Sequence, residues 1–180
     1  MEFLCTSLTD AYIVKSVLHE DERGFFSRIR CSEEFAAHGL PSTFVQASIS
    51  HNVSAATFRG LHYQIPPSQE SKLVRCIAGA IDDVIVDLRP DSPTHLKHEW
   101  FRLSARELTA LYVPPGFAHG FLTVDDDTTV MYDMSDIYAP DLSRGIRWSD
   151  PLLKIQMPGE IKAINARDAE YQDIEPESLQ

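Results

Sequence analysis

The side chains best suited to acid–base chemistry are two histidines, a lysine and a tyrosine in strand-like surroundings. Arg59 precedes His62 by three residues, and Lys72 opens a strand-like run ten residues after His62. His119 follows a Pro-Pro-Gly turn, and Tyr132 lies in a further strand-like run. An imidazole titrates near neutral pH, an ammonium can hold a developing negative charge and a phenol can donate a proton. Each residue alone is more often structural, so the hypothesis of a catalytic site rests on the set.

The spacing of Arg59 and His62 poses a geometric problem for such a site. Side chains three residues apart on a regular strand point to opposite faces. Gly60 lies between them, and a glycine within a strand allows a β-bulge that turns one of its neighbours. A bulge at Gly60 would let both side chains belong to one site.

Short runs rich in β-branched and aromatic residues dominate the chain, bounded by Gly, Pro, Asp or Ser. The runs predicted as strands are Tyr12–Leu18, Phe44–Ser50, Leu73–Ala78, Ile81–Leu88, His98–Leu103, Ala110–Val113, Gly120–Val124 and Thr128–Ser135. Many short strands with few helices predict an all-β fold, a sandwich or a small barrel. A closed barrel of about eight strands can hold one small ligand in its mouth, and an open edge can pair with a second copy.

Helical signals are few. The segment Ser32–His38 starts with a serine as its N-cap and an acidic first turn before it meets Gly39. A second short helix is predicted near Asn165, with turns at Ser104–Leu108 and Asp141–Arg144. The framework of the fold must therefore come from its sheets.

The run Ile81–Leu88 alternates in polarity. Asp83 and Asp87 fall on one face, and Val84 and Val86 fall on the other. A strand face with ionisable groups either meets water or lines a cavity, and water is the commoner neighbour of a carboxylate. We therefore expect Asp83 and Asp87 to face solvent.

The composition excludes several classes of function. The 180 residues carry a formal charge of −11, which argues against a general nucleic-acid binder but permits a local anion site built from a few cations. No apolar stretch approaches the ~20 residues that span a bilayer, and the first residues lack the features of a signal peptide. Three scattered cysteines, Cys5, Cys31 and Cys76, indicate free thiols in a reducing cytoplasm. The acidic tail at 172–180 is expected to be loosely ordered.

Several motifs in consistent order resemble the dTDP-4-dehydrorhamnose 3,5-epimerase family. They are RGLHYQ at 59–64, KLVRCIAG at 72–79, VDLRPDSPT at 86–94, VPPGFAHGF at 113–121, YAP at 138–140 and GIRWSDP at 145–151. The resemblance runs from about Asp21 to Asp168, most of the chain. It implies a single cupin-type jelly-roll domain over residues 1–180, a homodimer and no metal or other cofactor. It also implies a nucleotide-linked 4-keto-6-deoxyhexose as substrate.

Epimerisation beside a ketone requires a base, a donor to the enolate oxygen and an acid on the opposite face of the ring. His62 suits the base, because an imidazole titrates near neutral pH. Lys72 suits the enolate oxygen, and Tyr132 suits the acid because its phenol stays protonated. The resemblance implies that Asp168 orients His62.

The resemblance also implies binding residues. Arg59 and His119 would lie beside the sugar and pyrophosphate, because a guanidinium fork matches phosphate oxygens. Tyr138 would line the same mouth. Arg23 would meet phosphate and Phe26 would stack on the base, although a surface turn with a core phenylalanine is an open alternative for these two residues.

A metal site can be weighed from the residues themselves. Metal-binding cupins place two histidines one residue apart, then a glutamate, and a later histidine after a Pro-x-Gly turn. His119 fits the last position, but Gln64 stands where the second histidine would be. Lys72 is no ligand while it is protonated, and a histidine with a neutral amide is a poor first shell for Zn or Fe. This pattern favours acid–base chemistry without metal.

Departures from the family pattern fall among the residues that would read the nucleotide. Arg28 stands where a glutamate is usual, and Gln46-Ala47-Ser48 replaces a Gln-Asp-Asn stretch. Ser143 replaces another glutamate, and Ile137 replaces a tyrosine. We still expect Gln46, Ser48 and Arg28 to touch substrate. The departures suggest a different sugar nucleotide, a secondary dTDP-sugar pathway, or inversion at C3 or C5 alone.

Three other functions remain open from sequence. A sugar-nucleotide 3,4-ketoisomerase on the same barrel also uses a histidine base. A non-catalytic sugar-nucleotide-binding cupin would bind ligand without exchanging a proton. A metal-dependent dioxygenase is the last option. Product stereochemistry, solvent exchange and a metal assay would distinguish the three.

Overall fold

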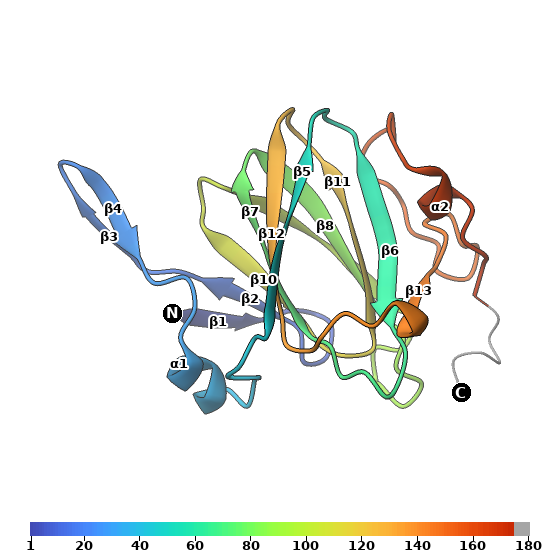
Figure 1. The fold of residues 1–180 in the computed structure, drawn as a ribbon, viewed down its shortest axis with the longest axis horizontal. Helices are drawn as coiled ribbons and strands as arrows, with labels where there is room; N and C mark the ends of the chain where they lie inside the picture. The colour runs from blue at the N-terminus through green and yellow to red at the C-terminus, as the bar shows by residue number, and fades with distance from the viewer. Residues whose placement is uncertain (175–180) are drawn as a thin grey trace.

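The strands form two facing sheets and a separate hairpin in the computed structural model, which describes residues 1–174 (Figure 1). One sheet has six strands in the order β1-β2-β10-β7-β12-β5, and the other has five in the order β13-β6-β11-β8-β9. The six-stranded sheet contains β1 (Glu2–Cys5), β2 (Tyr12–Lys15), β10 (Thr109–Val113), β7 (Lys72–Ala78), β12 (Thr128–Met134) and β5 (Gln46–Asn52). The five-stranded sheet contains β13 (Ser143–Gly145), β6 (Phe58–Gln64), β11 (Phe117–Thr123), β8 (Ala80–Asp87) and β9 (His98–Ser104).

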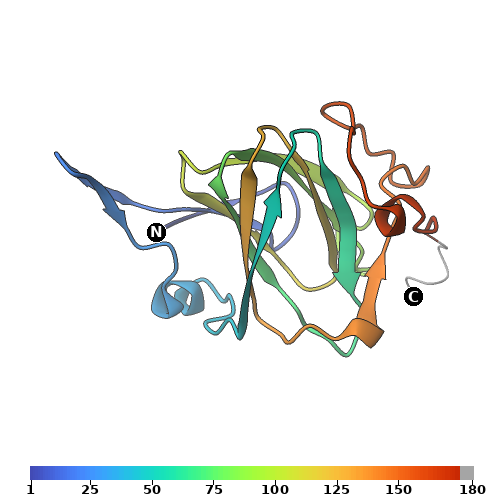
Figure 2. The same ribbon diagram turned by 45° about the horizontal axis from the view of Figure 1, so that its top comes forward.

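The hairpin of β3 (Leu18–Asp21) and β4 (Gly24–Ser27) projects away from both sheets in Figures 1 and 2. It follows β2 and returns to α1 (Ser32–Ala37), which packs on the outer face of the six-stranded sheet through Phe35. The other helices are the 3₁₀ turn η1 (Pro140–Leu142) and α2 (Ala166–Ala169). No helix in the described part of the chain is long and apolar enough to cross a membrane.

Three apolar clusters hold these layers together. The inner cluster lies between the sheets and takes side chains from both, including Val74, Ile85, Phe121 and Val130. A second cluster lies under the C-terminal segment, which covers the outer face of the five-stranded sheet. The third joins α1 to the six-stranded sheet. The alternation of β8 explains the first two, because Ile85 points inward while its neighbours Val84 and Val86 point outward.

Most of the predicted strands are confirmed, with ends shifted by a few residues. The helix near Asn165 is also confirmed, since the Asn165 side chain accepts a hydrogen bond from the Asp168 N–H as an N-cap. The serine cap predicted for the first helix is wrong. Ser32 is already the first helical residue, Cys31 occupies the N-cap position, and no side chain there caps the helix. The acidic tail predicted at 172–180 falls for the most part on residues 175–180, which lie outside the described residues.

The prediction that Asp83 and Asp87 face solvent is wrong, because both side chains are fully buried. Their strand has neighbours on both sides, and its outer face is the apolar one that the C-terminal segment covers. The acidic face of β8 must therefore point between the sheets. Each buried carboxylate is paired, Asp83 with His119 and Asp87 with Arg89.

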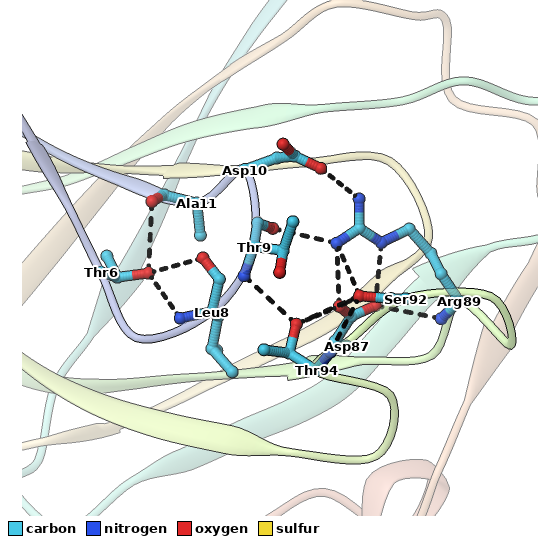
Figure 3. A network of polar contacts seen from close by, with 9 residues as sticks. All are labelled: Thr6, Leu8, Thr9, Asp10, Ala11, Asp87, Arg89, Ser92 and Thr94. Atoms are coloured by element: carbon cyan, nitrogen blue, oxygen red, sulfur yellow. Dashed lines mark hydrogen bonds and ion pairs between the residues drawn. The ribbon is translucent and has the colours of Figure 1, made fainter.

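Asp87 anchors a structural network at the end of β8 (Figure 3). Its carboxylate accepts hydrogen bonds from the Arg89 guanidinium and from the hydroxyls of Ser92 and Thr94. Arg89 also donates to Asp10 at 2.7 Å and to the carbonyl oxygen of Thr9 at 2.9 Å. The VDLRPDSPT motif therefore ties the β1–β2 loop to the five-stranded sheet, which is a structural role.

Candidate active site

The bulge predicted at Gly60 is confirmed and brings Arg59 and His62 to one cavity. His62 pairs with His119 across β6 and β11, whereas Arg59 pairs with Phe121, so β6 carries one residue more between these pairs. Gly60 has a φ of +139°, and a Cβ there would lie 2.6 Å from the Cα of Gly120. Only glycine fits this close approach of two strands.

The cavity between the sheets has a volume of about 290 Å³. That is near the lower end of the range of small-molecule sites, about 300–1,000 Å³. Strands of both sheets line it, together with the segment after β12. The lining residues are Ser48, Ser50, Arg59, His62, Tyr63, Gln64, Glu70, Lys72, His119, Phe121, Tyr132, Met134, Tyr138 and Ser143. Seven of the predicted site residues, namely Ser48, Arg59, His62, Lys72, His119, Tyr132 and Tyr138, are thus in one place.

His62 forms a dyad with Asp168, as the resemblance implied. Its Nε2 lies 2.9 Å from Oδ1 of Asp168, whose Oδ2 accepts the Gly60 N–H at 3.0 Å. Burial alone would raise the pKa of the Asp168 carboxyl, but the hydrogen bond and charge of His62 and the Gly60 N–H lower it on balance. The aspartate therefore stays ionised and holds Nε2 as the protonated nitrogen, which leaves Nδ1 as the basic atom.

The C-terminal segment delivers Asp168 to the dyad. Within the GIRWSDP motif, Arg147 pairs with Asp173 at 2.6 Å and Asp150 accepts the backbone N–H of Ile174 at 2.6 Å. This anchored segment also places the ring of Tyr171 edge-on against His62, with centroids 5.9 Å apart. Sequence reasoning did not find Tyr171.

His119 forms a second, more deeply buried dyad, with Nε2 2.8 Å from Oδ2 of Asp83. Burial raises the pKa of the Asp83 carboxyl against the opposing effect of His119. The His119 ring also meets Tyr132 edge-on, with centroids 5.9 Å apart. The two dyads lie on neighbouring strands, because His62 and His119 are cross-strand partners.

The Tyr132 hydroxyl is held in its protonated form. Burial raises the pKa of its hydroxyl far above the ordinary value, the nearby Asp83 carboxylate adds to the increase, and Arg59 opposes it. The phenol therefore keeps its proton throughout the neutral range. It enters the cavity from the six-stranded sheet, opposite the sheet that carries His62.

Lys72 and Arg59 are the cations of the cavity, and they differ in their partners. The Lys72 Nζ lies 2.7 Å from Oε2 of Glu70. The Arg59 guanidinium donates to Oδ1 of Asn52 at 2.7 Å and to the carbonyl oxygen of His51 at 3.4 Å. Gln46, predicted to touch substrate, instead accepts the backbone N–H of Tyr138 at 2.6 Å and so supports the cavity rim.

The structure does not bring the hairpin residues to this cavity. Arg23 pairs with Asp21 on the hairpin itself, and the Phe26 side chain is 74% exposed. Arg28 lies 3.5 Å from Glu34 at the start of α1. None of these three residues lines the cavity of its own chain.

The cavity-lining side chains of the kinds that bind metals, two histidines and a glutamate, are each paired with another side chain. His62 pairs with Asp168, His119 with Asp83 and Glu70 with Lys72. Across residues 1–174, no group of three or more His, Cys, Asp or Glu side chains is arranged to hold a metal ion.

Sequence reasoning missed Asp83, Glu70 and Tyr171. For Asp83 the strand itself did not decide the orientation, because Asp83 shares one face with Ile81 and Ile85 while Val84 and Val86 occupy the other. For Glu70 the signal was its spacing two residues before Lys72, which puts opposite charges on one side of an extended chain. Tyr171 gave no signal, since its contact with His62 depends on how the C-terminal segment returns.

The comparisons with known proteins agree with this geometry. A family model described as dTDP-4-dehydrorhamnose 3,5-epimerase matches residues 5–175. A dTDP-4-dehydrorhamnose 3,5-epimerase of Shigella flexneri is 37% identical over 169 residues, which cover 93% of each chain. The crystal structure of the Bacillus anthracis dTDP-4-dehydrorhamnose 3,5-epimerase with TDP and PPi bound has a TM-score of 0.92 at 38% identity, covering 96% of this chain and 99% of that one.

A mono-epimerase is also similar. ChmJ, a 3′-monoepimerase from Streptomyces bikiniensis in complex with dTDP-quinovose, has a TM-score of 0.86 at 31% identity, covering 93% of this chain and 85% of that one. Two antiparallel sheets around an acid–base cavity define a cupin jelly-roll isomerase. The chain belongs to the dTDP-4-dehydrorhamnose 3,5-epimerase family. The jelly-roll fold class and the epimerase function predicted from the sequence are thereby confirmed.

Proposed function

We propose that this epimerase inverts C3, C5 or both in a nucleotide-diphospho-4-keto-6-deoxyhexose, with a dTDP-sugar as the first substrate to test. The observation that carries the proposal is the meeting of His62, Lys72 and Tyr132 in one cavity, with the base and the acid on opposite sheets. Such an arrangement suits removal of a proton from one face of a ring and its return to the other.

In the proposed reaction, Nδ1 of His62 takes the proton from the carbon next to the ketone. The ionised Asp168 carboxylate stabilises the resulting imidazolium. The Lys72 ammonium stabilises the enolate oxygen, and Tyr132 returns a proton to the opposite face of the same carbon. Positioned acid–base groups contribute about 10²–10⁴-fold each, and one oxyanion contact about 10²–10³-fold.

Arg59 is the proposed phosphate ligand. Its hydrogen bonds go to the neutral acceptors Asn52 and His51, and within the described residues it forms no ion pair. An unbalanced guanidinium at the cavity wall favours a diphosphate, which also offers the matching fork geometry.

The proposed enzyme is a homodimer in which the β3–β4 hairpin reaches the partner's cavity. An isolated two-stranded hairpin is marginal in water, and this one exposes Phe25 at 56% and Phe26 at 74%. Arg23 and Phe26, which the resemblance assigns to the nucleotide, lie on it and away from their own cavity. A second copy would bury the aromatic rings and complete the nucleotide site.

We also propose a cytoplasmic location for this protein. In that reducing compartment Cys5, Cys31 and Cys76 would stay reduced.

The number of inverted centres follows from product analysis. Ser48 and Ser143, two departures from the family pattern, both line the cavity, and ChmJ shows that a similar fold supports 3′-monoepimerisation. Proton NMR of the product would show inversion at C3, at C5 or at both. A migrated ketone would instead identify a 3,4-ketoisomerase.

The decisive experiment is exchange of solvent deuterium into 4-keto-6-deoxyhexoses carried on dTDP, CDP, GDP and UDP. We expect deuterium at C3, C5 or both for at least one nucleotide. The same assay on ligand-saturated protein tests the non-catalytic alternative, since a binding module would retain the sugar without exchange. Binding with no deuterium incorporation for any nucleotide would contradict the proposed function.

A further inference from the structure

Glu70 is the one carboxylate among the described residues that line the cavity. Its side chain is only 4% exposed, and that of Lys72 is 14% exposed, with 2.7 Å between Oε2 and Nζ. A carboxylate removed from water costs free energy unless a partner offsets the loss. The pair therefore stabilises both charges at one end of the cavity.

The loop that carries Glu70 is fixed on both sides of it. The Ser68 hydroxyl accepts the backbone N–H of Glu70 at 3.3 Å and donates to Asp136 at 3.0 Å. On the other side, the backbone N–H of Ser71 donates to the Ser135 hydroxyl at 2.8 Å, and the Ser135 N–H returns to the Ser71 carbonyl at 3.0 Å. The loop is thus hydrogen-bonded to the end of β12, and the place of Glu70 is set by the fold.

Lys72 and Arg59 consequently differ in what they can bind. Arg59 has only neutral partners, so its charge is available to a permanent anion. A phosphate or carboxylate placed against Lys72 would also meet the Glu70 carboxylate and be repelled. A ketone oxygen is neutral when it binds and becomes negative only as the enolate forms, so it meets no such repulsion in the ground state.

We propose that Glu70 is a positioning and specificity residue that keeps the Lys72 ammonium charged, in place and reserved for a neutral carbonyl oxygen. This inference rests on the proposed function and deepens it. It specifies that the sugar ring beside Lys72 carries no acidic substituent, so keto-uronic acids are excluded as substrates. It also specifies that phosphate binds to Arg59 and not to Lys72.

Other titratable groups face the same space from neighbouring elements. They are Arg59, His62 and Tyr63 on β6, His119 on β11, Tyr132 on β12 and Tyr138 after it. His62 and His119 each have their own aspartate. Glu70 is therefore the acidic group in direct contact with Lys72, and a change at Glu70 acts on that ammonium first.

The first test measures how readily Lys72 is acetylated by acetic anhydride as the pH is raised, read by mass spectrometry with the exposed Lys154 as internal reference. In Glu70→Gln the midpoint for Lys72 should move to lower pH by about 1–3 units, because the ammonium loses an opposite charge in contact with it. Glu70→Asp, which keeps the charge, should restore most of the midpoint. A merely structural role would lower the melting temperature and leave the Lys72 midpoint relative to Lys154 unchanged, and that result overturns the proposal.

The second test asks whether inorganic phosphate protects Lys72 from acetylation. In the wild-type protein, phosphate should leave the Lys72 rate unchanged, whereas in Glu70→Gln it should slow the reaction by about tenfold, since the repelling carboxylate is gone. Protection of Lys72 in the wild-type protein overturns the proposal, even where Glu70→Gln fails to fold. Neither test needs turnover, so absence of deuterium exchange would refute the proposed function while these results still decide the role of Glu70.

Discussion

At the scale of single residues, His62 and Tyr132 have distinct tasks that a pair of substitutions can separate. His62→Ala removes the base and should abolish deuterium exchange. Tyr132→Phe removes only the returning acid, so the epimerised product should fall by about 10²–10⁴-fold while the first exchange slows less. Exchange and product are measured in the same samples by mass spectrometry and NMR. Full activity in both variants would remove these assignments.

The Asp168 carboxyl links the dyad to stability in acid. Its pKa in the folded protein is lower than the unfolded value of about 3.9. On acidification the unfolded chain therefore binds this proton first, and the stabilisation is complete above about pH 5 and is lost as pH falls through the folded pKa. The melting temperature of wild type should exceed that of Asp168→Asn at about pH 5, and the margin should shrink towards about pH 3. An equal margin at both pH values would contradict this account.

At the scale of elements, the β6 bulge joins fold to site. Gly60→Ala introduces a Cβ 2.6 Å from the Gly120 Cα at a φ of +139°. The strained backbone alone costs about 1–3 kcal/mol, and the clash must also part β6 from β11. We expect a lower free energy of unfolding together with loss of exchange, because Arg59 and His62 no longer share the cavity.

The matched control is Gly39→Ala. Gly39 also has a positive φ, +70°, but a Cβ there meets nothing within 4 Å. It should cost only about 1 kcal/mol, from the left-handed backbone, and leave exchange intact. Urea unfolding of both variants measures the difference, and equal losses of stability would show that the strand contact at Gly60 is unimportant.

Elements with strong local signals were predictable, and those that depend on distant partners were not. The alternating and β-branched runs of β8 and β12 give clear strands in the sequence. The three-residue β13 exists because it pairs with β6, and β3 and β4 have only each other. In the site, Gly60 between Arg59 and His62 predicted the bulge, and the family resemblance predicted the role of Asp168. The inward orientation of Asp83 was not decided by its own strand, because either face of β8 could be inside until the C-terminal segment covered the apolar one.

At the scale of the whole molecule, the projecting hairpin predicts that two chains build each nucleotide site. If so, Arg23→Ala damages the nucleotide site of the partner chain, whereas His62→Ala damages the cavity of its own chain. Each variant should therefore be impaired as a homodimer. Unfolding and refolding the two variants together should yield heterodimers in which one site holds both native residues. Random pairing would restore about a quarter of the wild-type sites.

Activity of the co-refolded mixture, measured by deuterium exchange, checks this, with sedimentation velocity to establish the dimer. His62→Ala co-refolded with Lys72→Ala is the control, because both residues line the same cavity of one chain and every site would lack one of them. Recovery in the first mixture and none in the second is the expected result. If Arg23 serves the partner's site, the heterodimer has one site with every native residue, and that site must be active. Recovery in neither mixture, with dimers present, would therefore place Arg23 outside the partner's site.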